Sequence, residues 1–232
     1  MPRTIRTGLY HVKHAHSIRR SLTETDAMPQ AKTSSSKARN APEPANAPEL
    51  RQRILDTAAE LFYREGVRAI GVDLVVERAA VAKTSLYRYF RTKDELVAAF
   101  LQQEDAEFWQ QWDDAVRRHA PDPHAELDGL LKWIGERVAR PGYRGCPQLN
   151  VGAEFADPKH PARVVAAAHK LEQRRRLAAI CKRLGATRPE LLASQLALLI
   201  DGAFTSGSLL LGEGAARALR GAGAALVEAA AR

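Results

Sequence analysis

Six side chains that can donate hydrogen bonds lie within the segment 83–89: Lys83, Thr84, Ser85, Tyr87, Arg88 and Tyr89. Lys and Arg can bond to guanine edges or to phosphates, Ser and Thr hydroxyls can bond to either, and Tyr hydroxyls commonly reach phosphates. The spacing predicts a helix over 83–90, whose first N–H groups would also face phosphate. These residues together indicate a helix that enters a DNA groove.

Two further helices are predicted to position this one. The first carries one apolar face and ends near Gly66, a residue suited to the left-handed position after a helix; its apolar residues are Leu50, Ile54, Ala58, Leu61 and Phe62. The second is shorter, and its apolar face consists of Val72, Val75, Val76 and Ala79. A break at 80–82 follows, after which Leu86 and Phe90 can pack inward. This order is typical of a helix-turn-helix. Lys93 opens the next helix, where it could hold the DNA backbone.

At these residues the chain resembles the TetR-type (tetracycline-repressor-like) transcriptional regulators. The resemblance is carried by ILDTAAELFYREGVRAIGVD, ERAAVAKTSLYRYF and the trailing KDEL. It implies a three-helix DNA-binding domain at 49–95 and a helical ligand-binding and dimerisation domain at 96–232. It also implies a regulator, most often a repressor, that binds near-palindromic double-stranded DNA as a homodimer and is released by a small-molecule effector.

The chain departs from the family pattern at two places in the turn. Ala80 stands where the family usually has Gly, and Ala82 stands where it often has Ser. If the backbone at Ala80 has a positive φ, Ala costs up to about 1 kcal/mol relative to Gly. A Ser at position 82 would cap the recognition helix and could touch phosphate, and Ala can do neither.

The remaining segments predict an all-α body of about nine helices in total, because none shows sustained strand alternation. Helical segments are expected at 94–120, 124–139, 145–156, from about 161 to 184, 188–211 and 213–232, separated by Pro and Gly. In this family the last two long helices usually form the dimer interface. We therefore expect a stripe on 188–211 to form it, made of Leu192, Leu196, Leu199, Ala203, Gly207 and Leu210. The alternative is that this stripe is internal core.

A ligand pocket is expected between the helix that follows the DNA-binding domain and the helices up to about residue 204. Aromatic and polar residues suggested for its lining are Phe100, Phe108, Trp109, Trp112, Trp133, Asn150, Glu154, Phe155, His169 and Phe204. Asn150 and Glu154 are one helical turn apart on a segment otherwise made of small residues. They are the polar pair that we predict to contact the ligand, and Glu154 would favour a cationic or hydrogen-bond-donating effector. Each residue taken alone fits a place in the core better than a ligand contact.

The first 48 residues are basic and predicted to be a disordered tail or linker. They carry a net charge of +5 out of +8 for the chain, and residues 32–48 are rich in Ser, Pro and Ala. Three interpretations stay open: a transit peptide, a genuine extension, or an internal start at Met28. A nonspecific architectural DNA-binding protein that uses this tail is the alternative function.

Composition and motifs argue against several other classes. The chain has 232 residues and two cysteines, Cys146 and Cys181, which suits a reducing cytosol rather than a disulfide scaffold. No apolar run approaches the length of a membrane span, so no membrane partner is expected. There is no G-x-S-x-G, no H-E-x-x-H and no phosphate-binding Gly loop, so we expect neither an enzyme nor a cofactor or metal, and we expect a bacterial cytoplasmic protein associated with the nucleoid when bound to DNA.

Overall fold

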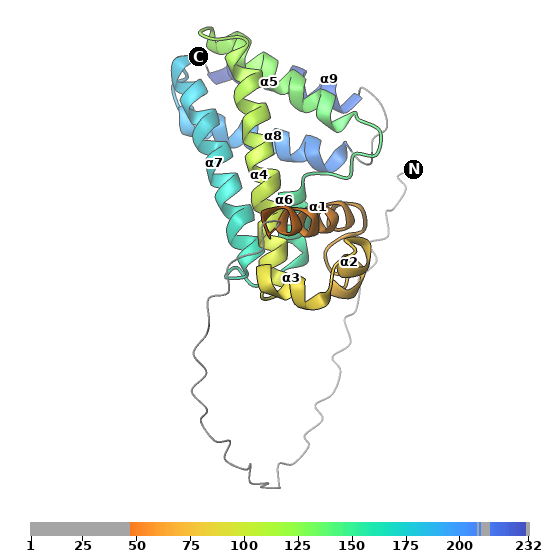
Figure 1. Ribbon diagram of the computed structural model, residues 1–232. Coiled ribbons are helices and arrows are strands. Elements are labelled where there is room, and N and C mark those ends of the chain that lie inside the picture. The colour runs from red at the N-terminus through yellow and green to blue at the C-terminus, as the bar shows by residue number, and fades with distance from the viewer. Residues whose placement is uncertain (1–46, 208, 210–213, 231–232) are drawn as a thin grey trace, which may run out of the picture. The chain divides into compact units, whose positions relative to one another are not determined.

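Helices make up the regular structure of the described residues, which are 47–207, 209 and 214–230 of this computed structural model. The fold class predicted from the sequence, all-α with an N-terminal helix-turn-helix and a larger helical body, is confirmed within them. The helices are α1 (Ala47–Glu65), α2 (Val72–Arg78), α3 (Lys83–Tyr89), α4 (Lys93–Arg117), α5 (Pro123–Val138), α6 (Pro147–Glu154), α7 (Pro161–Arg183), α8 (Pro189–Ser206) and α9 (Gly214–Ala230) (Figure 1). The predictions for the tail, including Met28 as a start, lie outside this part of the chain.

The starts of the helices follow from local sequence chemistry. Four helices begin with proline, which lacks the N–H that a first helical residue leaves unpaired and already has a helical φ. At the start of α4, the hydroxyl of Thr92 accepts a hydrogen bond from the Glu95 N–H at 3.1 Å, and the Glu95 carboxylate accepts one from the Arg91 N–H at 2.6 Å. These reciprocal bonds satisfy two N–H groups at the helix start, as a capping box does.

Several helix boundaries predicted from the sequence were wrong by a few residues, and the C-terminal end of α8 differed most. The helix expected to reach Leu211 ends at Ser206, with Gly207 as its last capping residue. Ser206 and Gly207 both disfavour continuation of the helix, but the apolar pattern of the segment 188–211 predicted one continuous helix. The segment expected at 145–156 is helical only over Pro147–Glu154, because Gly145 has a φ of +98° and Cys146 is extended.

Two buried clusters form the core. The first joins α1, α2 and α3 to the beginning of α4, where Phe62 and Phe100 meet edge to face with ring centroids 5.9 Å apart. The second joins the rest of α4 to α5, α7, α8 and α9 around Phe108, Trp112 and Phe204. Figure 1 shows α4 running from α3 up to α5 and α8, with α7 beside it. Because α4 contributes to both clusters, it is the rigid connection between them, and the expected division at residue 95 stays a prediction.

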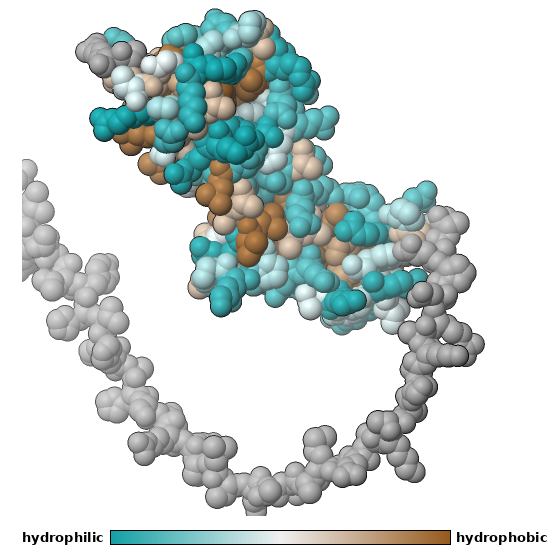
Figure 2. Space-filling view, turned by 90° about the vertical axis from the view of Figure 1, so that its left-hand side faces the viewer, coloured by the Kyte–Doolittle hydropathy of each residue, from teal (hydrophilic) through white to brown (hydrophobic). Residues whose placement is uncertain are grey.

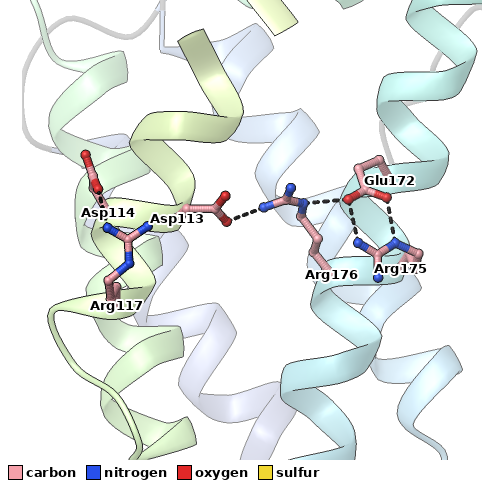
Figure 3. A network of polar contacts seen from close by, with 6 residues as sticks. All are labelled: Asp113, Asp114, Arg117, Glu172, Arg175 and Arg176. Carbon is pink, nitrogen blue, oxygen red and sulfur yellow. Dashed lines mark hydrogen bonds and ion pairs between the residues drawn. The ribbon is translucent and has the colours of Figure 1, made fainter. Parts of the chain in front are cut away.

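A network of charged side chains holds α4 and α7 together (Figure 3). Arg176 of α7 lies between Asp113 of α4 and Glu172 one turn earlier on α7. Glu172 also accepts two hydrogen bonds from Arg175, both at 2.6 Å. These bonds favour the ionised carboxylate, and they lower the pKa of Glu172 to about 2.

Glu172 should therefore stabilise the protein above about pH 5 and lose that effect as pH falls towards 2. Its folded pKa lies below its unfolded value, so the unfolded state takes up the proton first. Since the Arg175 side chain is 68% exposed, solvent screening limits the effect to about 1 kcal/mol. We expect the difference in unfolding free energy between wild type and Glu172→Gln to shrink by that amount between about pH 5 and pH 2 in denaturant titrations. The exposed Gln110→Ala on α4, which involves no titratable group, should show no such change, and equal behaviour of the two variants would contradict the prediction.

Candidate nucleic-acid interface and cavity

The turn before α3 contains a strained residue, because the backbone at Ala80 has a positive φ. Ala80 has a φ of +52°, the left-handed region that favours glycine. Ala82 takes the position before the helix with extended backbone, φ −71° and ψ 143°, and provides no side-chain cap. Ala80 thus occupies a position whose backbone favours Gly, and Ala82 occupies a capping position where a Ser side chain could accept a hydrogen bond.

Replacing Ala80 with Gly is expected to raise the free energy of unfolding by up to about 1 kcal/mol. The glycine removes the clash of Cβ with the backbone at φ +52°. The neighbouring Ala79→Gly is the matched control, since Ala79 is 3% exposed and has an ordinary φ of −75°. It should destabilise by about 1 kcal/mol, and chemical unfolding that gave both variants the same sign would contradict the prediction.

Helix α3 has one buried and one exposed face. Leu86 and Phe90 are buried in the core that α3 shares with α1 and α2, whereas Lys83, Thr84, Tyr87 and Arg88 are exposed. Ser85 and Tyr89 are half-buried, and the Tyr89 hydroxyl is fully buried. A contact of that hydroxyl with phosphate, which the sequence suggested, therefore does not fit the described conformation: the ring packs against the first core cluster.

Both lysines singled out from the sequence have distinctive surroundings. Lys83 Nζ lies 2.6 Å from Asp73 Oδ1 of α2, and this bond raises the pKa of Lys83. Lys93 at the start of α4 is half-buried, and burial lowers its pKa. The ion pair with Asp73 fixes the position of the Lys83 ammonium group. The Asp73 carboxylate would therefore lie beside any phosphate that Lys83 contacts.

A small cavity, with room for about one water-sized molecule, lies where α4, α5, α6, α7 and α8 converge. Its lining is formed by Glu104, Phe108, Arg137, Tyr143, Cys146, Pro147, Gln148, His169 and Phe204. Glu104, Arg137 and Tyr143 also line an open groove on the surface, so the groove is the natural entrance. Burial raises the pKa of Glu104, with Glu107 adding to the effect and Arg137 opposing it.

Three of the residues suggested for a pocket line this cavity: Phe108, His169 and Phe204. Trp109, Trp112 and Trp133 pack around the Phe108 ring without being among the lining residues. Phe100 belongs to the other core cluster, and Phe155 stacks on His160 with ring centroids 3.8 Å apart. Neither Phe100 nor Phe155 lines this cavity, so the prediction that they face a ligand does not fit it.

The polar pair predicted to contact a ligand lies elsewhere. The Glu154 carboxylate accepts hydrogen bonds from the Val67 N–H at 3.2 Å and the Arg68 N–H at 2.9 Å, in the loop between α1 and α2. Asn150 is exposed and donates to the carbonyl of Arg144 at 2.8 Å. The small residue Gly152 of α6 lies against Ala166 of α7, so the small residues indicate close packing on α7 rather than an open pocket.

The stripe predicted for dimerisation is mostly internal. Leu192, Leu196 and Ala203 are buried within the protomer. Leu199 is half-buried against the same core, Gly207 approaches Val138, and Leu210 lies outside the described residues. The exposed apolar residues of α8 are one position earlier, at Leu191 and Leu198. Helix α8 is apolar on nearly every side, so its sequence alone could not tell the inner face from the outer one.

Six lining residues were missed from the sequence: Glu104, Arg137, Tyr143, Cys146, Pro147 and Gln148. One signal was available, because Glu104 precedes Phe108 by four residues and so shares its helix face. No periodicity exists for the loop that carries Tyr143 and Cys146, and its path depends on tertiary packing. The described residues contain no group of three His, Cys, Asp or Glu side chains placed to hold a metal, and none of their helices is long and apolar enough to cross a membrane.

Comparison with known proteins places this arrangement in a family. The family model described as "Bacterial regulatory proteins, tetR family" matches residues 54–100. The chain is 30% identical over 135 residues to the transcriptional regulator AcuR of Cereibacter sphaeroides, an alignment that covers 58% of this chain and 60% of AcuR. The chain thus spans less than two thirds of that relative.

Solved structures extend the match over nearly the whole of the described region. A TetR-family transcriptional regulator from Streptomyces coelicolor superimposes with a TM-score of 0.76 at 29% identity, covering 80% of this chain and 97% of that one. A putative TetR transcriptional regulator from Streptomyces avermitilis superimposes with a TM-score of 0.70 at 33% identity, covering 78% and 97%. The resemblance found in the turn and the recognition helix is confirmed, and the chain belongs to the tetR family of bacterial regulatory proteins.

Proposed function

We propose that this protein is a homodimeric transcriptional regulator that reads a near-palindromic DNA site with α3 and changes its DNA affinity when a small molecule occupies the cavity. The observation that carries the proposal is the division of α3 into an anchored face and an exposed face of hydrogen-bonding side chains. Lys83, Thr84, Tyr87 and Arg88 are exposed while Leu86 is fully buried. A rigid helix with such a face is what direct readout in the major groove requires.

Two polar contacts support coupling between the cavity and the DNA-binding helices. The Tyr63 hydroxyl of α1 accepts a hydrogen bond from the Arg144 N–H at 3.0 Å, next to Tyr143 of the cavity. At the other end of α6, Glu154 binds the loop between α1 and α2. A ligand that displaces Tyr143 or α6 would therefore disturb contacts that hold the helix-turn-helix. Release from DNA requires that this ligand bind the arrangement with lower DNA affinity more tightly.

The exposed apolar surface supports a dimer. Leu171 of α7 and Leu191 and Leu198 of α8 are 65%, 45% and 74% exposed. Figure 2 views the protein from the α7 side, and it shows hydrophobic residues gathered in patches among polar ones. Burying a leucine side chain contributes about 1.5–3 kcal/mol, and two-fold symmetry would use each residue twice. We assign the dimer interface to this face, called here the α7–α8 face, in place of the internal stripe.

Selection of bound sequences from a random duplex pool at about physiological salt tests the proposal. The expected result is a near-palindrome whose half-sites are one helical turn of DNA apart, or a multiple of it. Recovery of no preferred sequence would overturn it and favour the nonspecific architectural function, in which binding survives loss of the helix-turn-helix.

Substitutions of the two lysines should separate sequence reading from backbone binding. Lys83→Met is expected to weaken the selected site more than random DNA, by about 10-fold, because a contact to a base edge contributes about 1–3 kcal/mol. Lys93→Met should weaken both DNAs alike and lower the slope of log affinity against log salt by about one unit. Binding isotherms at several salt concentrations measure both, and the exposed Lys132→Met on α5 should change neither. Equal loss on both DNAs for Lys83→Met would remove it from base reading.

A further inference from the structure

Three buried polar atoms that lack a hydrogen-bond partner within the described residues belong to side chains that line the same cavity. They are Tyr143 Oη, Gln148 Oε1 and His169 Nε2. Gln148 is 3% exposed and His169 is 1% exposed, so neither side chain is turned towards solvent. Buried polar groups are nearly always hydrogen-bonded, and three such atoms around one space indicate a polar occupant.

Neighbouring contacts fix what two of these atoms can do. Gln148 Nε2 donates to the carbonyl of Leu101 at 2.9 Å, and because a carbonyl only accepts, the remaining Gln148 Oε1 is an acceptor. His169 Nδ1 lies 2.5 Å from Asp105 Oδ1, which places the ring proton on Nδ1. In the neutral ring, His169 Nε2 is then an acceptor as well. The cavity therefore presents Gln148 Oε1 as an acceptor, and His169 Nε2 as a second acceptor while the imidazole ring is neutral.

Tyr143 provides the complementary group. Burial raises the pKa of Tyr143 well above its ordinary value, so the side chain stays a hydroxyl that can donate. The charged lining residues are one acid and one base, Glu104 and Arg137, so the cavity has no excess of either sign. The rings of Phe108 and Phe204, with centroids 6.1 Å apart, supply the apolar part of the wall.

We propose that the cavity binds a small uncharged molecule with an apolar body and a polar end that offers two hydrogen-bond donors and one acceptor, as a primary amide does. The two N–H groups would bond to Gln148 Oε1 and His169 Nε2, and the carbonyl would accept from the Tyr143 hydroxyl. This inference rests on the proposed effector site and names the class of its ligand.

A carboxylate of the same shape fits the cavity poorly. Its oxygens only accept, so they would face the Gln148 acceptor and leave it unpaired, and Gln148 cannot turn without releasing the Leu101 carbonyl. The free space at the centre admits about one water-sized molecule, so the ligand must displace side chains as it enters. Such a displacement would begin at Tyr143, which is adjacent to the Arg144 contact with α1.

Calorimetric titration of the full chain with benzamide, benzoate and methyl benzoate tests the ligand class. Benzamide and benzoate are nearly isosteric, and methyl benzoate keeps the carbonyl but has no N–H donor. Benzamide should bind once per protomer and at least about 10-fold more tightly than the other two. Tyr143→Phe, which removes only the hydroxyl, and Gln148→Leu should each weaken benzamide by about 10-fold, a change that corresponds to one lost hydrogen bond. The matched control is Gln110→Leu, which removes an exposed amide on α4 that does not line the cavity, and it should bind as wild type does.

Three results would overturn the inference. Benzoate binding at least as tightly as benzamide would assign the site to anions. Absence of binding by all three probes would mean that water alone satisfies the three atoms. Benzamide binding that neither Tyr143→Phe nor Gln148→Leu weakens would place the ligand elsewhere. Since the titration contains no DNA, it is independent of the sequence selection: preferential benzamide binding with no selected DNA sequence would remove the proposed function and leave this inference standing.

Discussion

Leu198→Glu is expected to convert the proposed homodimer into monomers and to weaken binding to a two-half-site operator by about 100-fold or more. Each protomer would then have to bind its half-site independently, and linked binding of two sites commonly exceeds single-site affinity by 10²–10⁴. The cause would be a desolvated carboxylate placed opposite its symmetry mate at the centre of the α7–α8 face.

Because Leu198 is exposed in the protomer, its substitution tests dimerisation separately from folding. Its side chain is 74% exposed in the protomer, so the substitution should leave the fold of the monomer intact. Analytical ultracentrifugation gives the mass, and circular dichroism verifies the helices. Ala106→Glu, an apolar-to-acidic change at an exposed position of α4, is the control and should remain dimeric. A dimer that persists in Leu198→Glu would move the interface to another face, such as the Ala- and Gly-rich exposed side of α9.

Glu154→Ala is expected to reduce the free energy of unfolding by about 2 kcal/mol and to loosen the helix-turn-helix. The carboxylate accepts two backbone hydrogen bonds, and its removal leaves the N–H of Val67, a residue that is 1% exposed, without its partner. An unpaired buried donor costs about 1–3 kcal/mol. The backbone amides of Val67 and Arg68 should therefore exchange with solvent about 10-fold faster or more.

Hydrogen exchange followed residue by residue measures this effect directly. Asn150→Ala, which changes an exposed side chain on the same helix, should leave both amides protected as in wild type. Unchanged exchange in Glu154→Ala would show that the contact does not hold the loop, and it would remove one of the two couplings between the cavity and the DNA-binding helices. If the variant binds the effector with wild-type affinity but responds less in DNA binding, Glu154 transmits the signal without touching the ligand.

The DNA-binding part was predictable because its signals are local. The apolar spacing of α1, the left-handed Gly66 at its end and the break at Ala80 each follow from residues within a few positions of one another, and the structure confirms all three. Even the strain at Ala80 could be formulated from sequence, since only a positive φ makes Ala costly there. The sequence did not predict which hydroxyls of α3 are exposed, and the Tyr89 hydroxyl is in fact buried.

The cavity and the interface required the tertiary structure. Glu154 was predicted as a ligand contact because a polar residue among small ones suggests a pocket, yet the same pattern serves a helix that lies against the α1–α2 loop. The outer face of α8 could not be chosen because leucines occur on both sides of it, and only packing against α5 and α7 decides which are buried.

By itself the sequence determined the helices, the helix-turn-helix and the family, since local propensity, capping and periodicity are written in neighbouring residues. The tertiary structure alone decided which atoms face one another across the fold. Tyr143, Gln148 and His169 come from a loop and two helices, and nothing in their spacing along the chain indicates that they line the same cavity. Packing of α4 against α7, reinforced by Arg176 between Asp113 and Glu172, brings those elements together.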